Sequence, residues 1–151
     1  MAAFSARRWC RAGPRPILAS METTSTHDHT SVFLVEDSAA IRERLAGLLG
    51  EIASVELVGE AETAIDAIDG ILRTRPDSVV LDIRLAQGSG IDVLRRVHPQ
   101  APEIVFIMLT NFANPQYRKI CMDAGASYFI DKSTEMARVK QIVSGLGVAH
   151  H

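Results

Sequence analysis

Short apolar runs of this 151-residue sequence end in polar residues that could bind a metal ion or a phosphoryl group. These residues are, in chain order, Glu36, Asp37, Asp82, Thr110 and Lys132. Carboxylate oxygens are the ligands that Mg²⁺ prefers, and a carboxylate can also act as the nucleophile that forms an acyl phosphate. A hydroxyl and an ammonium group beside it would hold phosphoryl oxygens. The set therefore indicates phosphoryl transfer at an acidic Mg²⁺ site.

These residues can meet only if the elements before them end at the same place. From residue 31 onward, short apolar runs alternate with segments of helical period. This alternation predicts an α/β fold, a doubly wound parallel sheet with helices on both faces. Strands are predicted at 31–36, 55–61, 78–82, 103–110 and 126–131. Because the carboxyl ends of parallel strands share one edge of the sheet, polar residues far apart in the chain would form one site.

Five helices are predicted between and after these strands. They cover about 38–50, 62–73, 91–97, 115–125 and 134–146. Asp37 or Ser38 would cap the first helix, and Asn114 followed by Pro115 would begin the fourth. Thr134 is predicted to start the last one. No repeat or linker interrupts this alternation, so one domain is expected.

The charge of the chain gives no reason to expect a nucleic-acid partner. Eighteen acidic residues against 16 basic ones give a formal charge of −2. Residues 1–30 carry four arginines against two acids, which leaves the remainder at −4 and without a clustered basic face. The apolar runs fall far short of the roughly 20 residues that cross a bilayer, so no membrane partner is expected. The two cysteines, Cys10 and Cys121, suit a reducing compartment, and a cytoplasmic location is predicted.

Residues 1–30 lack periodicity and are predicted to be a disordered N-terminal extension. The first 20 are rich in arginine and free of acids, as a transit peptide would be, and Met21 is an alternative start of the protein. The predicted folded domain covers 31–148, and residues 149–151 form a tail. Because the sequence ends at His151, no attached effector domain is expected.

Four motifs follow one another at the predicted strand ends: VED at 35–37, LDIRL at 81–85, LT at 109–110 and GASYFIDKS at 125–133. Together they resemble the receiver domain of two-component response regulators, of the stand-alone, single-domain type. The resemblance covers about residues 31–148. It implies a flavodoxin-like fold of a bacterial protein, with five parallel strands in the order 2-1-3-4-5.

The resemblance also implies the chemistry of the acidic site. Asp82 would be the phosphoacceptor, and a histidine kinase or a phosphotransfer protein would be the donor. A Mg²⁺ ion would be held by Glu36, Asp37, Asp82 and the backbone carbonyl of Arg84. The chain would then be a signalling phosphoacceptor rather than an enzyme.

A switch is implied as well. Thr110 and Lys132 would bind the phosphoryl group, and Phe129 would change its rotamer as Thr110 moves. The movement would remodel the surface of the fourth helix, fifth strand and fifth helix, which a downstream protein or a second copy of the chain would recognise. Two simpler roles stay open, because Lys132 could pair with Asp131 at the surface and Phe129 could be ordinary core.

Two other functions stay open for the whole chain. Ala86 stands where the family usually has proline, and Asn111 stands where a small residue is common. These departures are compatible with a receiver-like interaction module that acts without phosphorylation. The other alternative is a hydrolase with an aspartyl-phosphate intermediate, whose nucleophile would follow the first strand as Asp-x-Asp. That stretch reads VEDSAA here, which does not fit the pattern.

Overall fold

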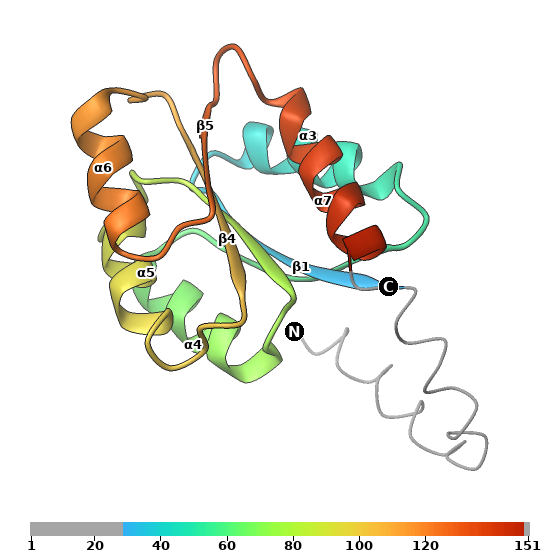
Figure 1. Cartoon of the computed structure of the whole chain (residues 1–151), viewed down its shortest axis with the longest axis horizontal. Coiled ribbons are helices and arrows are strands. Elements are labelled where there is room, and N and C mark those ends of the chain that lie inside the picture. Colours follow the sequence, from blue (N-terminus) through green and yellow to red (C-terminus); the bar gives the residue numbers. More distant parts are fainter. Residues whose placement is uncertain (1–28, 150–151) are drawn as a thin grey trace.

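The computed structural model describes residues 29–149 as a parallel sheet with helices on both faces (Figure 1). The strands are β1 (Thr30–Val35), β2 (Val55–Ala61), β3 (Ser78–Leu81), β4 (Val105–Thr110) and β5 (Tyr128–Asp131). The helices are α3 (Ala39–Gly50), α4 (Ala64–Thr74), α5 (Gly90–Val97), α6 (Pro115–Asp123) and α7 (Ala137–Ala149). The strand order β2-β1-β3-β4-β5 confirms the predicted fold. The predictions for residues 1–28 and 150–151 lie outside the described residues.

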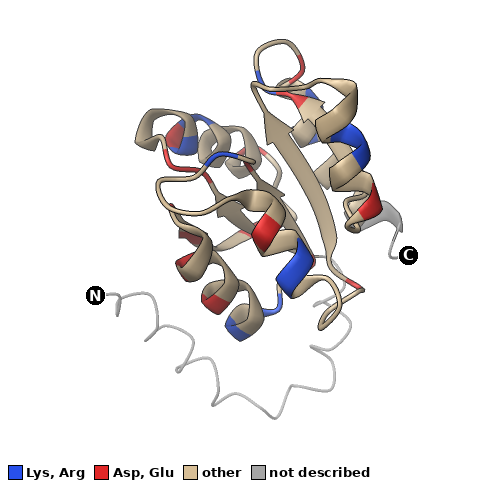
Figure 2. Cartoon of the chain, turned by 90° about the vertical axis from the view of Figure 1, so that its left-hand side faces the viewer, with Lys and Arg blue, Asp and Glu red and all other residues tan. Residues whose placement is uncertain are grey.

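Alternate side chains of each strand point to opposite faces of the sheet and divide the core into two layers. Phe33 and Val35 pack with α4, α5 and α6, whereas Val32 and Leu34 pack with α3 and α7. Figure 2 shows most of the charged residues on helices and loops. Among the strands, β2 contains Glu56 and Glu60, and β5 ends at Asp131. Within residues 29–149, no helix combines the length and the apolar character that a membrane span requires.

Side chains at the start of the helices set their boundaries. The N-cap residues Ser38, Thr63, Ser89 and Asn114 each accept a backbone N–H from the first turn. Such caps satisfy donors that have no partner inside the helix. The prediction for Ser38 and for Asn114 with Pro115 is confirmed. The first strand begins at Thr30, one residue earlier than predicted.

The last helix begins at Ala137 rather than at Thr134. Asp131 explains the difference, because its carboxylate accepts the Ser133 N–H at 2.9 Å and the Ser133 hydroxyl at 2.7 Å. The Glu135 side chain accepts the Asp131 N–H at 3.1 Å. Aspartate bonds of this kind offer the backbone a turn in place of a helix. The turn therefore delays the helix by three residues and fixes the segment that contains Lys132.

Candidate functional site

The ends of the parallel strands bring the predicted site residues to one edge of the sheet. Glu36 and Asp82 directly follow β1 and β3, which are neighbours in the sheet. The Asp82 N–H donates to the carbonyl of Val35 at 3.1 Å, so the two strand ends stay level. Lys132 follows β5, and its N–H donates to the carbonyl of Thr110 at 2.8 Å. Backbone pairing alone thus positions four of the predicted residues.

Lys132 forms the centre of a buried charged cluster. Its ammonium group donates to Asp82 Oδ2 at 2.7 Å and to Glu36 Oε1 at 2.9 Å. Glu36 is 1% exposed, Asp82 5% and Lys132 8%, so these charge-assisted bonds replace most of the lost hydration. The alternative in which Lys132 pairs with Asp131 is wrong, because the Asp131 carboxylate bonds to Ser133 instead.

Asp37 adds a third carboxylate to this cluster. Each of Glu36, Asp37 and Asp82 offers one oxygen, and these oxygens lie within 4.8 Å of one another. Asp37 is exposed, whereas the other two carboxylates are buried. Lys132 neutralises only one of the three negative charges. An oxygen-only donor set with excess negative charge and one side open to water fits Mg²⁺, which takes one or two carboxylates and keeps several waters.

Burial and charge act against each other in this cluster. Burial raises the pKa of Glu36 above its ordinary value of 4.5, although bonds from Lys132 and from the Ser38 N–H oppose the shift. Burial alone would lower the pKa of Lys132, but its bonds to Asp82 and Glu36 prevail and raise it. Lys132 therefore stays an ammonium group at neutral pH. The raised pKa of Glu36 makes its ionisation unfavourable for the fold as the pH rises above 4.5.

Thr110 is the last residue of β4, and Arg84 lies on the loop that follows Asp82. Thr110 is fully buried, and its hydroxyl oxygen accepts the Phe112 N–H at 3.0 Å, which leaves its own proton free to donate. The Arg84 guanidinium lies 4.4 Å from the centre of the Phe112 ring, within the range of a cation–π contact. This contact links the loop after β3 to the loop after β4. The role of the Arg84 backbone carbonyl as a Mg²⁺ ligand stays a prediction.

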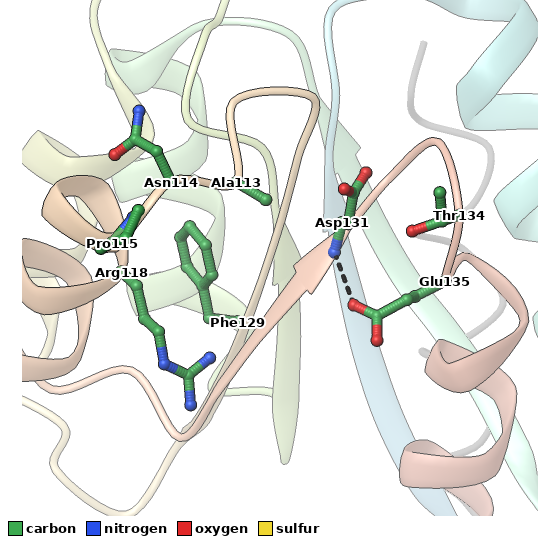
Figure 3. A pocket seen from close by; sticks show the side chains of 8 residues that line it. All are labelled: Ala113, Asn114, Pro115, Arg118, Phe129, Asp131, Thr134 and Glu135. Atoms are coloured by element: carbon green, nitrogen blue, oxygen red, sulfur yellow. Dashed lines mark hydrogen bonds between the residues drawn. The ribbon is translucent and has the colours of Figure 1, made fainter.

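Phe129 has the protein core on one side and a pocket on the other. It is 8% exposed and belongs to the core layer of α4, α5 and α6. Figure 3 shows its ring between Arg118 and the segment of Ala113 and Asn114. The pocket they line has a volume of about 430 Å³, and the Arg118 guanidinium lies 6.0 Å from the ring centre. The structure is compatible with both roles considered for Phe129, core residue and switch.

Sequence reasoning missed Gly90, which the fold places against the backbone of Asp82. The Gly90 N–H donates to the carbonyl of Ile83 at 2.7 Å. A Cβ atom at position 90 would lie 2.0 Å from the carbonyl oxygen of Asp82, which is closer than any non-bonded contact allows. Only glycine permits this approach. Its absent side chain therefore helps to define where Asp82 sits.

Gly90→Ala is expected to lower the free energy of unfolding by about 1–3 kcal/mol, the usual cost of an overpacked position. Urea denaturation followed by circular dichroism would measure it. Gly47→Ala is the matched control, because Gly47 is exposed within α3 and its added Cβ meets nothing within 4 Å. The control should stabilise the protein by about 0.5–1 kcal/mol, since alanine restricts the unfolded chain more than glycine does. Equal stability of the two variants would contradict this account of Gly90.

Comparison with known proteins identifies the family of this chain. Residues 32–144 match the family model of the response regulator receiver domain. The DNA-binding transcriptional activator DevR/DosR of Mycobacterium tuberculosis is 32% identical over 116 residues, which cover 77% of this chain and 54% of the relative. A response regulatory protein of Vibrio cholerae is 34% identical over 117 residues, which cover 77% and 48%. The chain thus spans about half the length of these relatives.

Solved structures show the same fold. A two-component response regulator of the LuxR family from Aurantimonas sp. SI85-9A1 matches with a TM-score of 0.74 and 25% identity, covering 80% of this chain and 86% of that one. The match to a complex of CheX, CheY, BeF3 and Mg from Borrelia burgdorferi has a TM-score of 0.71 and 24% identity, covering 78% and 88%. That second likeness concerns the fold alone. The family match over most of the chain, together with this fold, shows that the protein belongs to the response regulator receiver domains of two-component systems.

Proposed function

We propose that this receiver domain accepts a phosphoryl group on Asp82 and signals through the change of shape that follows. The observation that carries the proposal is the cluster at the sheet edge, where Asp82 shares Lys132 with Glu36 and lies beside Asp37. A carboxylate oxygen of Asp82 would attack phosphorus, and the bond from phosphorus to a histidine nitrogen of the donor protein would break. A histidine kinase or a phosphotransfer protein would be that donor.

The residues around Asp82 would each have a part in this transfer. Glu36, Asp37, Asp82 and the carbonyl of Arg84 would hold Mg²⁺. When bound, the ion supplies positive charge to the phosphoryl oxygens. Lys132 would exchange its bond with Asp82 for one with a phosphoryl oxygen.

The signal would leave the site through Thr110 and Phe129. Thr110 would donate its hydroxyl proton to the phosphoryl group. The pocket beside Phe129 offers space into which the ring could turn as Thr110 moves. The surface of α6, β5 and α7 would then change and be read by a separate downstream protein or by a second copy of the chain. The DNA binding stated in the name of the DevR/DosR relative belongs to that protein, of which the match covers 54%.

Incubation with a small phosphodonor tests the proposal. The full chain is treated with acetyl phosphate and MgCl₂, or with acetyl phosphate and EDTA, and analysed by intact mass and by mapping of acid-quenched peptides. One phosphoryl adduct is expected, on the peptide that contains Asp82 and only when Mg²⁺ is present. Absence of an adduct, or an adduct on another peptide, would overturn the proposed acceptor and favour a module that acts without phosphorylation.

Mg²⁺ is expected to stabilise the fold. An ion that binds only the folded state adds about 2.7 kcal/mol to the free energy of unfolding when its concentration is 100 times its dissociation constant. Urea denaturation with increasing MgCl₂ would measure the gain. Asp37→Asn should reduce this gain, because it removes the charge of one of the three candidate carboxylate ligands. The same gain in this variant would remove Asp37 from the set of ligands.

A further inference from the structure

Arg42 holds three acceptors that belong to two neighbouring strand ends. Its Nη1 donates to the backbone carbonyl of Glu36 at 2.7 Å. Its Nε and Nη2 pair with Glu60 at 3.0 Å and with Glu62 at 3.1 Å. The Arg42 side chain is 16% exposed, so most of it is shielded from water. All three nitrogens of this planar guanidinium have a partner, so the three acceptors are held in one fixed geometry.

The carbonyl that Arg42 holds belongs to the peptide between Glu36 and Asp37, the candidate metal ligands that follow β1. Other bonds hold the same stretch: the Glu36 N–H donates to Ala61 at 3.0 Å, and the Ser38 N–H donates to the Glu36 carboxylate at 3.1 Å. Arg42 completes this arrangement from the first turn of α3. Arg42 therefore adds a bond at the peptide from which Asp37 leaves the backbone.

The two glutamates connect Arg42 to the loop that follows Asp82. Glu60 lies in β2, and Glu62 directly follows that strand. The carbonyl of Glu62 accepts the N–H of Ala86 at 3.0 Å. Ala86 is four residues beyond Asp82 in the same loop. Arg42 thus ties together, through Glu62, the two segments that carry the candidate metal ligands.

Charge and geometry predict opposite effects when Arg42 is removed. Loss of a cation near an acidic cluster makes the local potential more negative, which by itself strengthens the binding of Mg²⁺. Loss of the bond to the Glu36 carbonyl would loosen the ligands and weaken binding, since groups that orient metal ligands typically contribute about 10- to 100-fold to affinity. The two glutamates are 42% and 55% exposed, and ion pairs at such positions add little to stability. The sign of the change in affinity therefore separates the two effects.

We propose that Arg42 is a positioning residue of the metal site, which sets the peptide between Glu36 and Asp37 relative to the loop after Asp82. The inference rests on the proposed function, because it concerns the Mg²⁺ ion of that function. Arg42→Met is expected to weaken Mg²⁺ binding about tenfold, measured by calorimetric titration of the folded full chain with MgCl₂. Arg42→Lys keeps the charge without the planar fork and should give an intermediate affinity.

Arg44→Met is the matched control. Arg44 is exposed on the same helix and forms none of these contacts, so its replacement changes the charge equally without loosening the site. Its Mg²⁺ affinity should equal or slightly exceed that of the wild type. In the metal-free protein, Arg42→Met should also shift the NMR amide signals of Asp37 and Ala86, whereas Arg44→Met should leave both in place.

The outcomes separate this inference from the proposed function. If the wild type binds Mg²⁺ and Arg42→Met binds it as tightly or more tightly, only the role of Arg42 is overturned. If the wild type itself binds no Mg²⁺, the metal site of the proposed function fails and the role of Arg42 fails with it. A tenfold loss in Arg42→Met with unchanged binding in Arg44→Met supports the inference. Urea denaturation of each variant confirms that the titrated protein is folded.

Discussion

Asp82→Asn is expected to abolish phosphoryl uptake from acetyl phosphate and Mg²⁺ while the fold stays intact. The amide keeps the shape of the side chain and an oxygen acceptor for Lys132, but it has no anionic oxygen to attack phosphorus. Lys132 also retains its bond to Glu36. The free energy of unfolding should therefore change by only about 1 kcal/mol, the net contribution of one hydrogen bond. Intact mass and urea denaturation on the same preparation measure both quantities.

Two further substitutions show whether that loss is specific. Asp69→Asn changes an exposed aspartate of α4 whose ion pair is with Arg73, and it should leave the uptake at the level of the wild type. Asp37→Asn removes a candidate ligand and keeps the nucleophile, so its uptake should be slower and need more Mg²⁺. A full yield of the phosphoryl adduct in Asp82→Asn would contradict the assignment of Asp82 as the acceptor.

Lys132→Met is expected to lower the free energy of unfolding by about 3–5 kcal/mol at pH 7 without metal, the usual cost of leaving buried charges without their partner. Asp82 and Glu36 would remain at 5% and 1% exposure with no cation between them. Lys140→Met provides the control, because Lys140 of α7 is only half-buried and pairs with the more exposed Glu51. A surface pair of this kind contributes about 0–1 kcal/mol.

The loss in the free energy of unfolding caused by Lys132→Met should depend on pH. Lys132 lowers the pKa of Glu36 through a hydrogen bond, so its removal raises that pKa further above 4.5. A carboxyl group whose pKa is raised by folding favours the folded state at acidic pH and opposes it as the pH rises through the folded value. The difference in stability between wild type and variant should therefore shrink from pH 7 to pH 5. A constant difference, or an equal loss in Lys140→Met, would show that the buried carboxylates are not its cause.

The sequence by itself determined the order of the elements and the edge of the sheet where chemistry can occur. The apolar run from Val32 to Val35 predicts a strand that is buried on both faces. Because successive side chains of a strand point to opposite faces, odd and even positions of this run belong to different core layers. Glu36 and Asp82 could be predicted to meet for a similar reason, since parallel strands end at one edge. Local pattern also identified Asn114 as a helix cap.

Only the tertiary structure decided which of these groups touch and what holds them. Lys132 meets Glu36 and Asp82, which are 96 and 50 residues away, and nothing local distinguished these partners from its neighbour Asp131. Arg42 and Arg44 look alike in the sequence, yet Arg42 alone reaches the carbonyl of Glu36. Contacts of this kind depend on how strands pair and helices pack over long separations, whereas periodicity reports only on which face of its own element a residue lies.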